Sequence, residues 1–420
     1  MNKLPEKLDY LPGLDGIRAL AAFLVIFTHW PNNSLSLRFG WIGVNIFFVL
    51  SGFLITRILL HEKHRSFKPY LSNFFYKRVL RIFPIYYLFF FITASIILLV
   101  YYFIPRLAGT DYIQLGFNTL KQDTPVYLTY TYNIKMNLGY FFNWPMYEHA
   151  FFGHLWSLAV EEQFYLIFPF IVYFSSTQLL KKIVIGIIIV CPLIRLWAAL
   201  VGVHLVTNRY WLGEFIYTNT FCQADALAMG ALIALFPIKI RFPYLNFFII
   251  SFICVTVGLI CLYFLRKAGY FLVEGRSLGF NFPALWFDEK TRWFLINIRA
   301  FYQYSLVNLF AFFLIAPATI KKPLCPAIFN ARPVSYMGKI SYGIYLFHSP
   351  ILGFFVVAAT FFGGWFSLTA KPLIHITIFV LYLAIVISLA HISYKYFERR
   401  IIDKYKYKPD VVPETSLHTN

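Results

Sequence analysis

Charged residues are scarce in this chain of 420 residues: they make up 13% of the sequence, against 60% hydrophobic and 21% aromatic residues. Soluble domains carry about 25% charged residues, so this composition, with a mean hydropathy of +0.66, excludes an ordinary soluble protein. Acidic residues are the scarcer kind, with 18 Asp and Glu against 37 Lys and Arg. The sequence therefore predicts an integral membrane protein with a formal net charge of +19.

Cysteine is also rare, and its spacing matches no metal or redox motif. The five cysteines lie in or beside apolar segments without a CxxC pair, and an odd number cannot pair completely. They are Cys191, Cys222, Cys254, Cys261 and Cys325. We therefore expect buried thiols, with no disulfide framework, no metal site and no resident cofactor.

Three further absences bear on the organisation of the chain. Residues 1–10 are polar and lead directly into the first apolar run, so no cleavable secretion signal is visible. The sequence shows neither a Ser/Gly-rich linker nor a second globular domain. It also shows no internal repeat, which weakens the case for a transporter built from two homologous halves. We expect one transmembrane domain, residues 1–397, and a disordered basic cytoplasmic tail, residues 398–420.

Apolar runs long enough to cross a hydrocarbon core of about 30 Å recur along nearly the whole chain. We predict an all-α polytopic membrane bundle of about ten transmembrane helices. Their ranges are 16–30, 41–60, 82–104, 154–174, 183–201, 217–236, 247–265, 300–317, 340–362 and 373–394. Two long connections, 105–153 and 266–297, suit either a wall that faces a sugar or ordinary extracellular loops.

The cations lie on alternate connections of this predicted bundle. The basic connections are residues 61–81, 181–182, 239–241, 321–339 and 395–408. The segment 111–152 carries only Lys121 and Lys135. This asymmetry follows the positive-inside rule, which assigns both termini of a multi-pass protein to the cytoplasm. Membrane topology thus accounts for the net charge, and we expect no nucleic-acid partner.

Two ionisable residues interrupt the first apolar run. Arg18 and His29 are eleven residues apart, which places them on nearly the same helix face, about 16 Å apart along the axis. Ionisable groups in a membrane helix are costly and normally face a cavity where chemistry or transport takes place. Alternatively, Arg18 snorkels to the inner surface beside Asp15, and His29 caps the outer end of the helix.

A second polar stripe lies near the middle of the chain. Spacings of three, four and four residues place its members on one helical face; they are His154, Ser157, Glu161 and Tyr165. Glu162 points about 100° away from them. Such a stripe is typical of a catalytic site or of an interhelical hydrogen-bond network.

Weaker signals accompany these two. Arg78 and Arg81 are one turn apart just before a predicted helix, so both guanidinium groups can bind one phosphate, although the topology rule also demands cations there. Asp225, Tyr345 and His348 interrupt apolar runs. Each of these three either lines the same cavity or satisfies a neighbouring helix.

The order of these motifs resembles that of membrane-bound O-acyltransferases of the acyltransferase 3 family. The resemblance is carried by residues 14–29, 43–55, 78–81, 154–166 and 340–350. It covers about residues 10–400, and it implies transfer of an acyl group, usually acetyl from acetyl-CoA, to a carbohydrate hydroxyl beyond the bacterial inner membrane. Some members append an SGNH hydrolase-like domain, and the chain resembles the stand-alone members.

The resemblance also implies residue roles. Arg18 and His29 match the family's arginine-and-histidine motif. Arg78 and Arg81 match its paired arginines, and Glu161 matches its acidic residue. We expect His29 to act as general base, oriented by Glu161 or exchanging protons with it.

The remaining roles concern the two substrates. Arg18, Arg78 and Arg81 are expected to bind the acyl-CoA co-substrate. Ser157 shapes the acceptor side or carries the acyl group in a covalent intermediate, a role also open to His29. The acceptor side is expected to contain His154, Trp156, Tyr165, Tyr345, His348 and Asp225. The acceptor is a carbohydrate or glycolipid, and the protein is embedded in the lipid bilayer.

Two other functional classes compete with this reading. A transporter would use Arg18, His29 and Glu161 as an intramembrane proton relay. A sensor or assembly subunit would keep the fold without catalysis. Acetyl-CoA-dependent acetylation by the purified protein favours the enzyme, whereas uphill substrate movement without covalent change favours the transporter.

Overall fold

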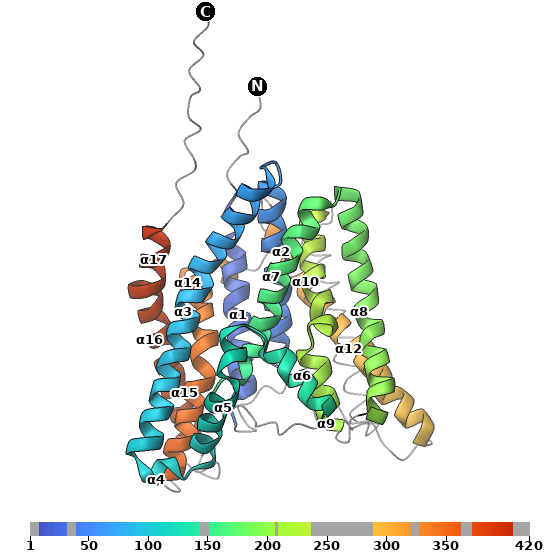
Figure 1. Cartoon of the computed structure of the whole chain (residues 1–420). Helices are drawn as coiled ribbons and strands as arrows, with labels where there is room; N and C mark the ends of the chain where they lie inside the picture. Colours follow the sequence, from blue (N-terminus) through green and yellow to red (C-terminus); the bar gives the residue numbers. More distant parts are fainter. Residues whose placement is uncertain are drawn as a thin grey trace, which may run out of the picture.

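The computed structural model describes residues 8–31, 39–142, 151–205, 209–236, 289–320, 327–362 and 372–405. All regular structure within these ranges is helical, and they contain no strand. The long helices run side by side in one bundle (Figure 1). The predicted all-α fold is therefore confirmed.

The helices of the first half of the chain are α1 (Pro12–His29), α2 (Ile42–Glu62), α3 (Phe67–Phe103), α4 (Pro105–Ala108), α5 (Asp111–Leu128), α6 (Tyr132–Phe142), η1 (Gly153–Leu155), α7 (Trp156–Phe174) and α8 (Thr177–Leu205). Those of the second half are α9 (Arg209–Thr218), α10 (Thr220–Leu235), α12 (Glu289–Ile315), η2 (Ala316–Thr319), α13 (Ala327–Asn330), α14 (Arg332–Lys339), α15 (Ser341–Phe362), α16 (Pro372–Ser393), η4 (Tyr394–Glu398) and α17 (Arg399–Lys404).

Within the described residues, six helical stretches are long and apolar enough to cross a membrane. They are Ile42–Glu62, Phe67–Phe103, Gly153–Phe174, Thr177–Gly202, Ser341–Ala358 and Ile374–Lys404. Their outer faces carry large apolar side chains, such as Phe103, Phe174 and Trp197, which are 75%, 71% and 62% exposed. Surfaces of this kind face lipid. Three further helices, α1, α10 and α12, pack among them.

Each predicted helix that falls on described residues corresponds to an observed one, and the predicted helix 247–265 lies outside them. Three boundaries were wrong. The helix predicted from 300 begins at Glu289. The helix predicted from 82 begins at Phe67, because no glycine lies between residues 67 and 82 and Pro69 lies in the first turn, where proline is tolerated. The helix predicted over 217–236 is divided at Asn219, whose side chain caps α10 by accepting the backbone N–H groups of Phe221 and Cys222.

Two segments predicted to lie outside the membrane spans contain helices. Residues 105–142 of the first long connection form α4, α5 and α6, and residues 143–150 and 266–288 lie outside the described residues. The predicted tail begins with α17 rather than with disorder. The hydroxyl of Tyr76 on α3 donates to the backbone oxygen of Tyr405, and this contact explains why the start of the tail is ordered.

The basic connections that the structure describes gather at one end of the bundle. Lys63 Nζ donates to Ser175 O at 2.5 Å and joins the α2–α3 turn to the end of α7. Figure 1 shows that turn and α17 at the upper end, with α4 and α9 at the lower end. The alternation of charge along the sequence is therefore a separation of charge between the two ends of the fold.

Helix α2 packs very closely against α10. A Cβ atom added at Gly52 would lie 1.9 Å from Leu227 O, and one added at Gly230 would lie 2.0 Å from Val49 O. Only glycine allows such an approach, as in other helix pairs of membrane proteins. The contact makes α2 a wall between two polar regions of the interior.

Candidate active site

Three imidazole rings meet beside the lower part of α1. The ring of His348 on α15 lies 5.0 Å from that of His29 and 4.9 Å from that of His154, measured between centroids. His29 Nδ1 lies 2.8 Å from Val25 O, and His154 Nε2 lies 3.1 Å from Leu346 O. A carbonyl only accepts, so these nitrogens carry the proton in the neutral rings. The basic nitrogen of His29 is therefore Nε2.

A pair of hydroxyl groups lies next to these rings. Ser157 Oγ is 2.5 Å from the hydroxyl of Tyr345, and the two oxygens lie 3.1 and 2.9 Å from His154 O. The Tyr345 ring also packs 5.5 Å from the His154 ring. The structure thus brings together side chains from α1, η1, α7 and α15 that the sequence analysis had singled out separately.

Glu161 lies one turn further along α7. Ser51 on α2 donates to Glu161 Oε1 at 2.7 Å, and Tyr165 donates to Oε2 at 3.1 Å. Four residues of helix place Glu161 about 6 Å beyond Ser157 along the axis. Among the described residues, its hydrogen bonds come from Ser51 and Tyr165 and not from His29, so Glu161 does not orient His29 through a direct hydrogen bond.

The three candidate arginines lie beyond Glu161, toward the basic end. The Arg78 guanidinium stands 5.7 Å from the centre of the Tyr165 ring, and it forms no hydrogen bond or ion pair with a described residue. Arg81 is close enough to interact electrostatically with Arg78 and with Arg18. Arg18 is paired with Asp15 at 2.6 Å. Because Arg78 and Arg81 lie inside α3, the prediction that they precede their helix was wrong.

These side chains form two groups, one around His154 and one around Glu161, that are one helical turn apart on α7, and we call them together the polar column. It comprises His29, His154, His348, Ser157, Tyr345, Glu161, Tyr165, Arg78, Arg81 and Arg18. Imidazoles occupy one end, then hydroxyls, a carboxylate and finally guanidinium groups. His29, Arg78 and Glu161 are only half-buried, and the Arg18 side chain is 19% exposed. The column is therefore accessible from outside the packed interior.

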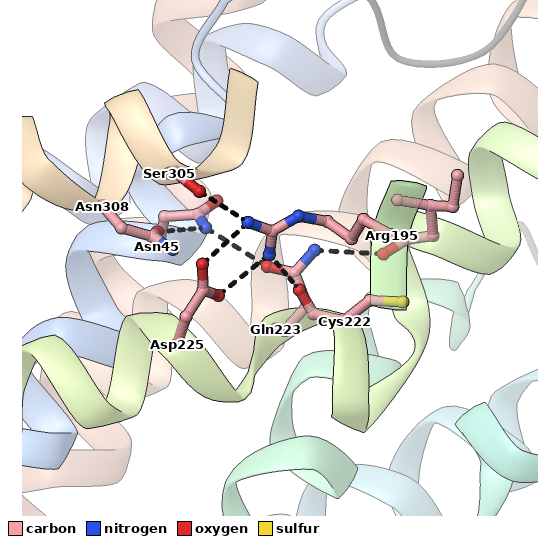
Figure 2. Close-up of polar contacts among 8 residues, drawn as sticks. Asn45, Arg195, Cys222, Gln223, Asp225, Ser305 and Asn308 are labelled. Carbon is pink, nitrogen blue, oxygen red and sulfur yellow. Dashed lines mark hydrogen bonds and ion pairs between the residues drawn. The ribbon is translucent and has the colours of Figure 1, made fainter. Parts of the chain in front are cut away.

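A second polar region surrounds Asp225 on the other side of α2 (Figure 2). The Arg195 guanidinium donates to both oxygens of Asp225, at 3.0 and 2.8 Å. It also donates to Ser305 Oγ at 2.7 Å and to Cys222 O at 2.5 Å. Arg195 is 0% and Asp225 1% exposed. This is a fully buried, bidentate ion pair.

Three amide side chains extend this region. Asn45 Nδ2 donates to Gln223 Oε1 at 3.3 Å and to Asn308 Oδ1 at 2.8 Å. Together with Arg195, Asp225 and Ser305 they form what we call the closed network, which ties α2, α8, α10 and α12 together. Asp225 therefore satisfies a neighbouring helix, one of the two roles that the sequence left open, and it lies outside the polar column.

Trp156 also departs from its neighbours on α7. Its ring packs 4.6 Å from that of Tyr217 and 6.0 Å from that of Phe48, away from the imidazoles. Trp41 packs on Tyr217 as well, at 5.9 Å. This aromatic group separates the polar column from the closed network.

The chain matches a known protein family. A family model described as an acyltransferase domain matches residues 11–394. The chain belongs to this acyltransferase family. It is 28% identical over 400 residues to O-acetyltransferase OatA of Staphylococcus aureus strain NCTC 8325 / PS 47, and to OatA of strain COL. These matches cover 94% of this chain and 58% of OatA, so the chain spans less than two thirds of these relatives. No solved structure matches it.

Several polar residues of this acyltransferase domain were missed from the sequence. Arg195 was detectable, because a cation within the predicted helix 183–201 must find a partner. Ser51 lies within the motif at 43–55 but was given no role, since a hydroxyl in an apolar helix normally bonds its own backbone. Its role follows from the approach of α2 to α7, which only the fold reveals.

No resident metal site accompanies these groups in the described part of the acyltransferase. No cluster of three or more His, Cys, Asp or Glu residues there has the arrangement of metal ligands. Cys191 and Cys222 are buried free thiols, as expected. Cys254, Cys261 and Cys325 lie outside the described residues.

Proposed function

We propose that this protein transfers an acyl group, most simply acetyl, from acyl-CoA to a hydroxyl of a carbohydrate on the opposite side of the bacterial inner membrane. The polar column is the observation that carries this proposal, because it joins a cationic end to a group of imidazoles through one bundle. Membership of the acyltransferase family and similarity to an O-acetyltransferase support the reaction class.

The cationic end suits the phosphates of acyl-CoA. Arg78 makes no ion pair with a described residue, and Arg81 is exposed one turn further along α3. Two guanidinium groups on one helix face bind phosphate oxygens through charge-assisted hydrogen bonds. Arg18 is close enough to interact electrostatically with Arg81 and is partly neutralised by Asp15.

His29 is proposed as the general base. Its Nε2 atom takes the proton of the acceptor hydroxyl while that oxygen bonds to the carbonyl carbon of the thioester. Collapse of the tetrahedral intermediate breaks the carbon–sulfur bond, and the imidazolium returns the proton to the thiolate of CoA. Glu161 lies one helical turn beyond Ser157 on α7, and its negative charge is proposed to favour the imidazolium form during transfer.

A direct transfer fits the geometry better than an acyl-Ser157 intermediate. A serine nucleophile needs a base within hydrogen-bonding distance. Ser157 Oγ instead contacts the hydroxyl of Tyr345 and the backbone oxygen of His154, and no imidazole nitrogen. We assign Ser157 and Tyr345 to binding of the acceptor or of the developing oxyanion.

The orientation follows from the charge separation between the two ends of the fold. The basic end is proposed to face the cytoplasm, where acyl-CoA is made, and both termini with it. The imidazoles then lie toward the outer face, where glycans are exposed. Residues 1–397 form the proposed transmembrane acyltransferase domain.

The proposal is tested with membranes that contain the protein and acetyl-CoA labelled in its acetyl group. Label should enter the glycan or glycolipid fraction and be released by mild alkali, as an O-acetyl ester is. Mass spectrometry of glycans from cells with and without the gene then identifies the acceptor. Uphill movement of a glycan without formation of any labelled ester would show that the protein is a transporter and not an acyltransferase.

A further inference from the structure

Between its phosphates and its thioester, acyl-CoA has a long middle part that the protein must also bind. Its pantetheine arm joins sulfur to phosphate through about thirteen bonds, or roughly 16 Å when extended. Arg18 and His29 are about 16 Å apart along α1. If the proposed function holds, the arm and its two amide groups therefore lie along the middle of the polar column.

Unsatisfied polar groups lie at that level. The hydroxyl groups of Tyr130 and Tyr342 are buried without a hydrogen-bond partner among the described residues. The two tyrosines are close enough to interact electrostatically with each other and with Glu162. Glu162 makes no hydrogen bond or ion pair with a described residue. Burying such groups without partners is costly, so a ligand that bonds to them is expected.

Tyr130 is held in place at a conformational cost. It has φ = 54°, the left-handed region that bulky side chains avoid. Its ring stacks on Phe83 at 5.4 Å and packs 4.4 Å from Tyr86, and its backbone oxygen accepts from Gln163 at 3.1 Å. Strain at a buried tyrosine with a free hydroxyl is typical of a binding site. The connection predicted as external therefore reaches the polar column.

Tyr342, the second tyrosine with an unsatisfied hydroxyl, lies on α15. It lies three residues before Tyr345, one turn nearer the basic end, and interacts electrostatically with both Glu161 and Glu162. Its hydroxyl thus lies between the Ser157–Tyr345 pair and the arginines.

We propose that Tyr130, Tyr342 and Glu162 bind the amide groups of the pantetheine arm. Tyrosine hydroxyls donate to amide oxygens, and a carboxylate accepts from amide N–H groups. A phosphate is excluded at this level because Glu162 would repel it. A hydrocarbon chain is excluded because it would leave both hydroxyls unsatisfied.

The test compares three acetyl donors: acetyl-CoA, S-acetylpantetheine, which lacks the nucleotide, and ethyl thioacetate, which lacks both nucleotide and amides. In Tyr130→Phe with Tyr342→Phe, we expect KM for the first two donors to rise about tenfold, with kcat and the ethyl thioacetate rate unchanged. Glu162→Gln should act in the same direction. Arg78→Ala should raise KM for acetyl-CoA alone.

The matched control is Tyr87→Phe. The Tyr87 ring packs 6.4 Å from that of Tyr130, and its hydroxyl already donates to Leu128 O at 2.9 Å. This variant should leave the donor KM unchanged and lower the melting temperature of the unliganded protein. Tyr130→Phe should keep or raise that temperature, because its hydroxyl has no described partner.

Three results would overturn the assignment. They are an unchanged KM for S-acetylpantetheine, an equal loss with all three donors, and a melting temperature of Tyr130→Phe that falls as in the control. Failure of the wild-type protein with every donor would instead refute the proposed function, so the two failures are distinguishable.

Discussion

Helix α2 separates two polar regions that differ in how their charges are matched. On one side, Arg195 and Asp225 are fully buried and bonded to each other through two hydrogen bonds. On the other, Arg78 and Glu161 are half-buried, and Arg78 has no ion pair with a described residue. A cation whose N–H groups are already bonded to a carboxylate inside the protein has few hydrogen-bond donors available for a ligand. The unpaired cation keeps its capacity to bind one.

The two regions also respond differently to loss of a group. Removing one partner of a buried ion pair leaves the other charge without compensation, which costs several kcal/mol of stability. Removing an unpaired, partly exposed group costs little stability but removes a contact to the substrate. Stability and activity should therefore separate between the closed network and the polar column.

The largest effect on activity is expected from His29→Ala. Loss of the general base should lower the rate of acetyl transfer by about 10²- to 10⁴-fold. The variant should remain folded and inserted in the membrane. Alkali-labile label in the glycan fraction measures the rate, with His64→Ala at the exposed basic end as the control. Transfer at the wild-type rate would remove His29 from the mechanism.

Glu161→Gln should have a smaller but clear effect on the polar column. The amide keeps the shape that receives hydrogen bonds from Ser51 and Tyr165 but loses the negative charge. We expect kcat to fall by about 10²-fold, with KM for the donor little changed. A rise in KM without a fall in kcat would show that Glu161 positions the donor instead.

Arg78→Ala combined with Arg81→Ala should weaken use of the donor. Each charge-assisted hydrogen bond to phosphate contributes about 1.5–3 kcal/mol, so KM for acetyl-CoA should rise at least tenfold at unchanged kcat. High salt should raise the KM of the wild-type protein for acetyl-CoA toward that of the variant. An unchanged KM would mean that these cations serve only to orient α3 in the membrane.

The smallest effect concerns the closed network. Ser305→Ala removes one hydrogen bond from Arg195 while the ion pair with Asp225 remains. We expect a loss of about 1 kcal/mol in the free energy of unfolding and no change in acetyl transfer. A selective loss of activity in this variant would place the network within the active site.

Much of the fold could be predicted because its causes are local. Apolar runs gave the helices, and helical spacing placed His154, Ser157 and Glu161 on one face. The contacts between helices could not be predicted, because they depend on packing across the bundle. The pairing of Arg195 with Asp225, the approach of Ser51 to Glu161 and the backbone of Tyr130 are examples.

The boundaries that failed have physical reasons as well. The sequence before residue 82 contains cations, which indicate the end of a membrane span but not the end of a helix. Helix α3 therefore begins at Phe67, outside the apolar run, and carries Arg78 and Arg81 within it. At Asn219 a capping side chain divides an apolar run that hydropathy alone describes as one helix.

The most direct test measures acetyl transfer and the free energy of unfolding together in Arg78→Met and Arg195→Met. The account predicts that Arg78→Met loses more than tenfold in transfer from acetyl-CoA and less than about 1 kcal/mol in stability. Arg195→Met should lose about 3–5 kcal/mol in stability while each folded molecule transfers at the wild-type rate. An equal loss of transfer rate per folded molecule in the two variants, together with an equal loss of stability, would contradict the distinction between the two regions.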